Sequence, residues 1–243
     1  MRPSPRLLLM QVTGLCNSER SRRSIVSPTQ FIDMYCERTD ASFWSEPVNA
    51  ITNLSYLAGA WIVWRAVARV RWTLPGSVRS LPPMMAAVGL CSFLFHTLAT
   101  VWAAVADQLT ILLFGCVFLY AFLCQAAGVS RTPALIVAVL FGAASYYAPQ
   151  LLPPGWLNRS GAYLPYLVGL LTMTAWLAAQ RRDTARIFGG AVALFCVALV
   201  VRTGDQTWCA QFPLGTHFLW HVLTGGVLTV LALALLREAA PAR

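Results

Sequence analysis

Long apolar stretches separated by short polar gaps make up most of the chain after about residue 47. Seven of these stretches come close to the roughly 20 residues that an α-helix needs to cross a bilayer. Proline and arginine residues fill the gaps between them. The pattern predicts an all-α, polytopic membrane protein, a seven-transmembrane helix bundle with spans at about residues 47–68, 82–101, 105–127, 133–151, 162–180, 186–203 and 215–236.

The chain before the first apolar stretch falls into two parts. Residues 1–30 are polar, and their apolar run at residues 7–10 is too short for the core of a signal peptide. We expect residues 1–30 to form a disordered tail or an over-extended start, and residues 31–243 to form one membrane domain. The polar and aromatic block at residues 33–49 carries four of the nine acidic residues.

Composition supports membrane insertion. Of all residues, 58% are hydrophobic and only 11% are charged, which is too few to cover the surface of a soluble protein. The net charge is +9, and all 18 basic residues are arginine. In a membrane protein such an excess usually lies in cytoplasmic loops, so we expect no nucleic-acid partner.

The distribution of arginine predicts the orientation of the bundle. One side of the predicted bundle has only Arg159 and Arg202 in its short loops. The other side carries ten arginines: Arg65, Arg69, Arg71, Arg79, Arg131, Arg181, Arg182, Arg186, Arg237 and Arg243. Because basic short loops stay in the cytoplasm, we predict an external N-terminus and a cytoplasmic C-terminus.

All three histidines of the chain lie in apolar stretches. His217 and His221 are four residues apart, so they share one face of a helix. His96 lies about 15 residues into its span, roughly 22 Å up a core of about 30 Å, which is the level at which the seventh span begins. Three imidazoles with an open water position form a catalytic zinc site. We predict that these histidines bind zinc; the alternative is that they are hydrogen-bonded packing residues.

Two more polar residues fall at the same level. Asp107, in the first turn of the predicted span 105–127, is expected to act as a general base or to orient a ligand; the alternative is a carboxylate that only stabilises the helix N-terminus. Ser92, one turn before His96, would hold water or an oxyanion, or would bond back to its own helix. Zinc lowers the pKa of bound water to about 7 and polarises carbonyls, so the set predicts hydrolysis of a lipid amide or ester.

The chain resembles the alkaline ceramidases, which belong to a superfamily of seven-helix membrane hydrolases that includes the progestin and adipoQ receptors. The matching motifs are Ser92-x-x-x-His96, Asp107, His217-x-x-x-His221, Tyr35-Cys36-Glu37 and Glu46-x-x-Asn49-x-x-x-Asn53. The resemblance covers residues 33 to about 236. It implies a zinc enzyme that hydrolyses the N-acyl bond of a ceramide, with Ser92 and Asp107 beside the reactive water.

The resemblance also implies calcium bound by the N-terminal segment. Glu37, Asp40 and Glu46 are the acidic residues at or next to the family's ligand positions, and oxygen ligands suit calcium. The alternative is a capped loop in which Glu37 pairs with Arg38 or Arg202.

The family has a disulfide between its N-terminal segment and its last outer loop, which here implies a Cys36–Cys209 bond. Both cysteines fall on the outer side in the predicted topology, where disulfides persist. Arg202 and Asp205, three residues apart, are expected to form a surface pair at the outer end of the sixth span.

Two other functions stay open at this point. A zinc-stabilised receptor or transporter would use the three histidines only to tie helices together. A hydrolase for another lipid amide or ester would use the same site, because nothing in the sequence specifies the acyl chain or the headgroup. For either hydrolase the partner is a membrane lipid substrate.

Overall fold

The computed structural model describes residues 27–153 and 156–240 of the chain. Within these residues extended pairing is limited to a single bridge between Phe31 and Thr100. The helical elements are α2 (Pro47–Thr52), α3 (Leu54–Ala68), α4 (Gly76–Arg79), α5 (Leu81–Leu98), α6 (Val101–Gln125), α7 (Arg131–Leu151), the 3-10 helix η1 (Trp156–Tyr163), α8 (Leu164–Ala179), α9 (Thr184–Trp208) and α10 (His217–Glu238).

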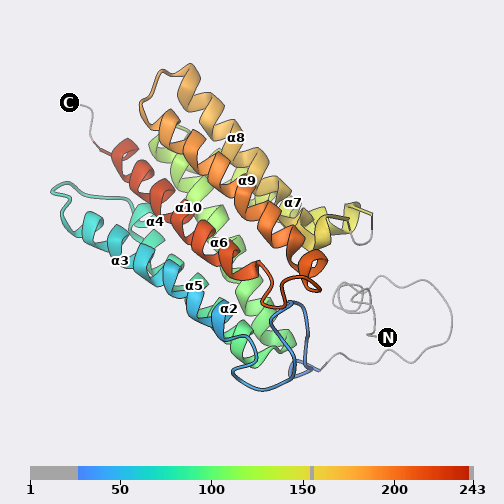
Figure 1. Cartoon of the computed structure of the whole chain (residues 1–243). Helices are drawn as coiled ribbons and strands as arrows, with labels where there is room; N and C mark the ends of the chain where they lie inside the picture. The colour runs from blue at the N-terminus through green and yellow to red at the C-terminus, as the bar shows by residue number, and fades with distance from the viewer. Residues whose placement is uncertain (1–26, 154–155, 241–243) are drawn as a thin grey trace.

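Seven long helices, α3 and α5 to α10, run side by side (Figure 1). Six helical segments, one in each of α5 to α10, are long and apolar enough to cross a membrane. The all-α seven-helix prediction is confirmed, and the chain is a multi-pass integral membrane protein. The orientation of the termini stays a prediction, because the helix packing is the same for either direction of insertion.

The first predicted span is divided in the structure. α2 and α3 together cover residues 47–68, but Asn53 separates them, and α3 alone has 15 residues. The Asn53 side chain donates a hydrogen bond to the carbonyl of Asn49 at 2.9 Å, and such local side-chain bonds compete with the regular helix. Pro47, at the first position of α2, suits a helix start because its missing N–H is not needed there.

α10 is the central helix of the bundle. It packs against α9 on one side and α3 on the other (Figure 1), and more than half of its most apolar stretch is buried inside the protein. The outward faces are apolar as well: Leu135 and Val139 on α7 and Val200 on α9 are between 55% and 62% exposed. An exposed apolar belt is costly in water and suits contact with lipid.

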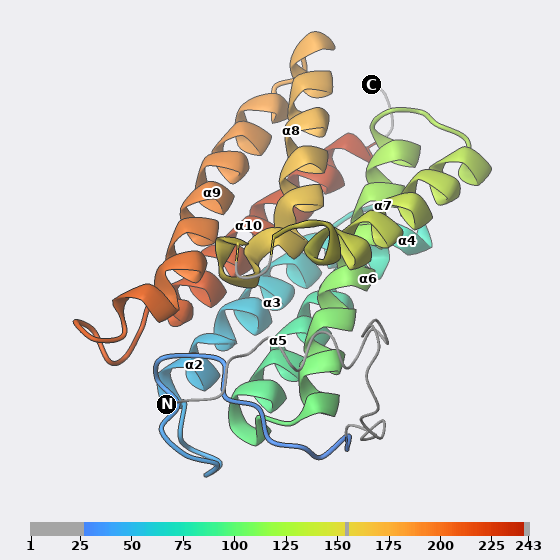
Figure 2. The ribbon, with the colours of Figure 1, turned by 90° about the vertical axis from the view of Figure 1, so that its right-hand side faces the viewer.

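An N-terminal segment, residues 27–46, covers one end of the bundle. Figure 2 shows it next to α2 and the turn between α5 and α6. Backbone hydrogen bonds join Ile32 to Ala99 at 2.7 Å and Val101 to Gln30 at 3.1 Å. Residues 1–26 of the predicted tail lie outside the described residues, whereas residues 27–30 contact the start of α6.

The predicted disulfide is present in the structure. Cys36 and Cys209 are bonded, with 5.3 Å between their Cα atoms and a sequence separation of 173 residues. The bond links the N-terminal segment to the residue that follows α9. The same end of the bundle therefore holds the N-terminal segment, the end of α5 and the starts of α6 and α10.

Candidate metal centre and active site

The three histidines meet at this end of the bundle. Their ligand atoms all lie within 4.8 Å of one another, and all three side chains are buried. The ring centroids are 5.2 Å apart for His96 and His217, 4.7 Å for His96 and His221, and 4.6 Å for His217 and His221. In residues 27–153 and 156–240, no other group of three or more His, Cys, Asp or Glu side chains converges in this way. The three histidines can hold a metal ion.

Helix ends explain why they converge. α5 stops at Leu98 because Ala99 adopts a left-handed conformation, with φ of 45°, and α6 begins two residues later at Val101. After this tight turn α6 runs back beside α5, so that Asp107 faces Ser92, one turn from His96. His217 is the first residue of α10, and His221 follows one turn later on the same face.

Hydrogen bonds orient two of the rings. His96 Nδ1 lies 2.6 Å from Oε2 of Glu46, and His221 Nδ1 lies 3.1 Å from the hydroxyl of Thr52. A protein partner on Nδ1 leaves Nε2 of each ring for a metal. His217 Nδ1 is buried and has no hydrogen-bond partner among the described residues. This set of imidazole donors, with one buried nitrogen that the protein leaves unpartnered, is compatible with zinc.

Asp107 is buried beside this group. It is the seventh residue of α6, so it lies in the second turn and not in the first turn as predicted. The prediction was wrong because helix α6 begins at Val101, before the apolar stretch used to place its start. The Gln108 amide donates a hydrogen bond to the Oδ2 atom of Asp107 at 3.4 Å. Its Oδ1 atom has no hydrogen-bond partner within the described part of the chain, which leaves an acceptor for a substrate or water.

Asp205 organises the start of α10. Its Oδ1 accepts hydrogen bonds from the backbone N–H groups of Thr216 at 2.7 Å and His217 at 2.9 Å, and its Oδ2 accepts one from Cys36 at 3.1 Å. Gly215 has a φ of +68°, and a Cβ there would lie 2.2 Å from the same carboxylate. Only glycine fits this approach without strain, so Asp205 and Gly215 together position His217.

Arg202 is buried, which corrects the predicted surface pair with Asp205. It is 6% exposed, its Nη1 donates to the hydroxyl of Ser160 at 2.9 Å, and its guanidinium lies 4.9 Å from the ring centroid of Tyr163 and 5.6 Å from that of Trp220. The spacing of three residues between Arg202 and Asp205 fits a surface pair as well as it fits the buried arrangement. The difference arises because η1, whose fold the pattern does not reveal, covers the end of α9.

Tyr35 is a site residue to which the sequence assigned no role. Its ring stacks on that of His217, with centroids 3.6 Å apart and planes inclined by 15°. It also lies 5.2 Å from the ring of His96. The feature of the sequence that could have identified Tyr35 is its position next to Cys36, which the disulfide fixes.

Among the described residues, the three carboxylates predicted to bind calcium form no group of three with converging oxygens. Glu37 accepts hydrogen bonds from the backbone N–H groups of Val48 at 2.6 Å and Asn49 at 2.8 Å, so it caps α2. Asp40 accepts the N–H of Ser42 at 2.8 Å. These contacts agree with the capped-loop alternative, although Glu37 bonds to backbone and not to an arginine.

Both carboxylate oxygens of Glu46 have partners within the protein. One carboxylate oxygen pairs with Nε of Arg38, and the other lies 2.6 Å from His96 Nδ1 and accepts the Asn49 amide at 3.0 Å. Burial alone would raise the pKa of Glu46, but His96 and Arg38 outweigh burial and lower it below its ordinary value. Glu46 is therefore ionised at neutral pH, and its carboxylate orients His96 through the contact with Nδ1. The donors present do not fit a calcium ion.

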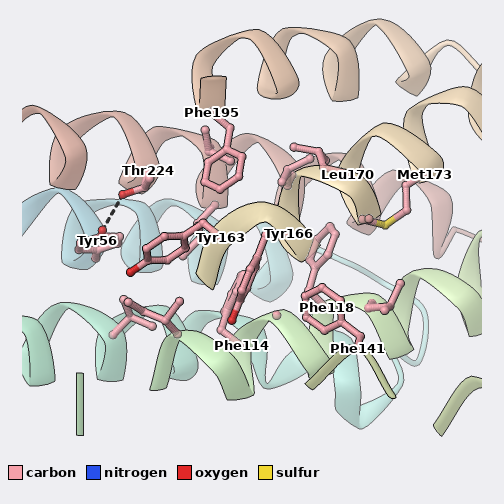
Figure 3. A pocket seen from close by; sticks show the side chains of 18 of the residues that line it. Tyr56, Phe114, Phe118, Phe141, Tyr163, Tyr166, Leu170, Met173, Phe195 and Thr224 are labelled. Carbon is pink, nitrogen blue, oxygen red and sulfur yellow. Dashed lines mark hydrogen bonds between the residues drawn. The ribbon is translucent and has the colours of Figure 1, made fainter. Parts of the chain in front are cut away.

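An apolar cavity of about 100 Å³ lies inside the bundle, and Trp220 and Thr224, which flank His221 on α10, are among the residues that line it. Figure 3 shows Tyr163, Tyr166, Phe114 and Phe118 around it, and a hydrogen bond of 2.6 Å between Tyr56 and Thr224. Tyr56 is also 6.3 Å from the ring of His221. The lining of the cavity continues to Met173 of α8 and Leu231 of α10, and it contains no histidine and no charged side chain. Such a space suits a hydrocarbon chain.

Comparison with known families adds an independent finding. The family model described as Ceramidase matches residues 32–240, which include all seven long helices and the N-terminal segment from Ile32. A search of curated proteins gave no match. The match covers most of the chain and contains the three histidines, Asp107 and the disulfide. The chain therefore belongs to the ceramidase family, and it is a membrane hydrolase of the class that acts on the amide bond of ceramide.

Proposed function

We propose that this chain is a zinc-dependent amidohydrolase that cleaves the N-acyl bond of ceramide, or of a similar N-acyl lipid, to a sphingoid base and a fatty acid. The observation that supports it most is the convergence of His96, His217 and His221 beside buried Asp107. Neighbours of His221 on α10 line an apolar cavity. A metal alone would account for the histidines. A buried carboxylate with an unpartnered oxygen next to them has a use in catalysis.

Each group has a distinct role in this proposal. His96, His217 and His221 hold zinc, which when bound acidifies water and polarises a carbonyl. Asp107 accepts the proton of the attacking water and returns it to the leaving amine, as a general base and then a general acid. Ser92, a neighbour of Asp107, donates a hydrogen bond to the oxyanion.

The cavity explains how a lipid is oriented. An acyl or sphingoid chain enters from the membrane between the helices and lies among the aromatic and aliphatic side chains of the cavity (Figure 3). The amide carbonyl then reaches the histidine end, where the polar groups are. Because the lining offers no charge, the chain is recognised by its shape and apolar surface.

The test combines metal analysis with turnover. We expect about one zinc per chain in the protein purified in detergent, and release of fatty acid from a short-chain fluorescent ceramide. His217→Ala should lose both, while Thr172→Val, an exposed threonine that bonds only to its own helix, should lose neither. Zinc without turnover of ceramide would indicate that the substrate is another lipid amide or ester. Absence of zinc in the wild type would refute the proposal.

A further inference from the structure

Arg38 is the largest fully buried side chain of the described residues, with 1% of its surface exposed. Its Nε pairs with the carboxylate of Glu46, and its Nη1 lies 3.0 Å from the carbonyl of Asp40 and 3.4 Å from that of Ser42. Its Nη2 donates to the carbonyl of His96 at 2.7 Å. A buried charge is tolerated only when it is paired and hydrogen-bonded, and here both conditions hold.

The surroundings of this guanidinium are those of a cation site. One carboxylate and backbone carbonyls from the loop at residues 40–42 surround it, and hard metal cations take the same oxygen donors. An arginine side chain supplies a positive charge and five N–H donors. Because it is part of the chain, this cation cannot dissociate, and its fixed positive charge repels a divalent ion from the oxygens around it.

Glu46 connects the guanidinium to the metal centre. It pairs with Arg38 through one oxygen and with His96 Nδ1 through the other, at 2.6 Å. Arg38 also holds the backbone carbonyl of His96. The ring and the main chain of one histidine are thus fixed by the same two residues. A carboxylate on the far nitrogen of a metal-binding histidine fixes its orientation and raises its affinity for the metal.

We propose that Arg38 is the built-in cation of the N-terminal segment, at the place where the family resemblance implies calcium. As a positioning residue it acts through Glu46 to hold His96 in place for zinc. Two consequences follow: the chain needs no calcium for stability or activity, and Arg38 sets the zinc affinity. The second consequence rests on the zinc site of the proposed function, whereas the first does not.

The first experiment examines the full-length wild type in detergent after dialysis into calcium-free buffer with its zinc retained. We expect less than about 0.1 calcium per chain, and no change in melting temperature or in fatty-acid release when 1 mM CaCl2 is added. About one calcium per chain, or a rise in melting temperature with calcium, would overturn the proposal. Melting and metal content need no substrate, so an inactive protein would count against the proposed function only.

The second experiment measures zinc affinity with a competing chelator in Arg38→Ala, Glu46→Gln and, as a control, Arg182→Ala. Arg182 also pairs with a glutamate, Glu238, but its side chain is half exposed. We expect zinc affinity to fall about 10- to 100-fold in the first two variants and to stay unchanged in the control. Methylguanidinium, a small cation of the same shape as the lost group, should restore at least part of the loss in Arg38→Ala only.

If Arg38→Ala does not fold, Glu46→Gln still tests whether Arg38 acts on His96 through Glu46, because this substitution keeps the shape of the side chain and removes its charge. Wild-type zinc affinity in Glu46→Gln would overturn the role assigned to Arg38 and Glu46. So would an equal loss in Arg182→Ala, since the effect would then be general to arginine–glutamate pairs.

Discussion

Each imidazole of the metal centre has a different neighbour. Glu46 bonds to His96, Thr52 bonds to His221, and Tyr35 stacks on His217. A carboxylate strengthens the donor character of an imidazole more than a hydroxyl does, because it carries a full negative charge. The three rings are therefore expected to contribute unequally to zinc affinity, with His96 the most strongly supported.

The Thr52 hydroxyl offers a direct test of this support. Thr52→Val keeps the shape of the side chain but removes the partner of His221 Nδ1, so zinc affinity should fall about 10-fold. The measurement is competition with a chromophoric chelator. Thr172→Val is the matched control, since its hydroxyl bonds only to the carbonyl of Val168. Equal zinc affinity in the two variants would argue that Thr52 has no part in orienting the ring.

Asp107 separates a catalytic site from a structural metal site. Asp107→Asn keeps the volume of the side chain but cannot accept a proton, so fatty-acid release should fall about 10²- to 10⁴-fold. Zinc content and melting temperature should stay at the wild-type level, because Asp107 is not among the three ligands. Wild-type turnover in this variant would mean that another group moves the proton.

Residues whose roles follow from local spacing were predictable from the sequence. The i, i+4 spacing of His217 and His221 fixes a shared helix face in any context, and hydropathy placed His96 at a matching depth. Glu46 and Arg202 behave differently. Their partners come from segments 50 and 42 residues away, and no pattern along the chain specifies such contacts. Seven spans were visible for a related reason, since each is a local apolar stretch, whereas the break at Asn53 depends on one side chain.

At the level of elements, the start of α10 depends on a turn that tolerates one residue type. Gly215 combines a φ of +68° with a close approach to Asp205, and the Asp205 carboxylate caps the first residues of the helix. Since His217 is the first helical residue, the turn and the ligand are coupled. A distortion here moves a zinc ligand as well as a helix end.

Replacing Gly215 would cost stability in two ways, through backbone strain and through a steric clash, and Gly128 allows the two to be measured separately. Gly128 has the same φ of +68°, but a Cβ added there would contact nothing within 4 Å. Gly128→Ala should cost about 1 kcal/mol from backbone strain alone, and Gly215→Ala about 1–3 kcal/mol more from the clash. Thermal unfolding in detergent measures both, and only Gly215→Ala should also weaken zinc binding. Equal melting temperatures would mean that the turn relaxes without cost.

At the level of the whole molecule, the metal centre lies at one end of the bundle, and the basic loops that follow α3, α6 and α8 lie at the other. The positive-inside rule then predicts that the centre lies toward the outer face and that the arginine-rich loops lie in the cytoplasm. A disulfide at the same end as the histidines agrees with this placement, because an oxidising compartment preserves it.

Cysteine labelling tests this orientation. Ala41→Cys and Thr73→Cys place thiols at exposed positions on opposite ends of the bundle. In intact cells a membrane-impermeant maleimide should label the first and not the second, and permeabilisation should expose both. The unsubstituted chain, which keeps its own free cysteines, gives the background. The reverse pattern would mean that the bundle is inserted with its N-terminus in the cytoplasm.

The separation of 173 residues between the cysteines also sets an order of events during synthesis. The ribosome releases Cys36 and His96 early, but Cys209, His217 and His221 come last. The three histidines therefore cannot meet before α10 has been made, and the covalent bond that fixes the N-terminal segment forms only after the sixth long helix, α9, has been synthesised. A chain that stops before His217 lacks two of the three histidines, and one that stops before Cys209 also lacks the disulfide.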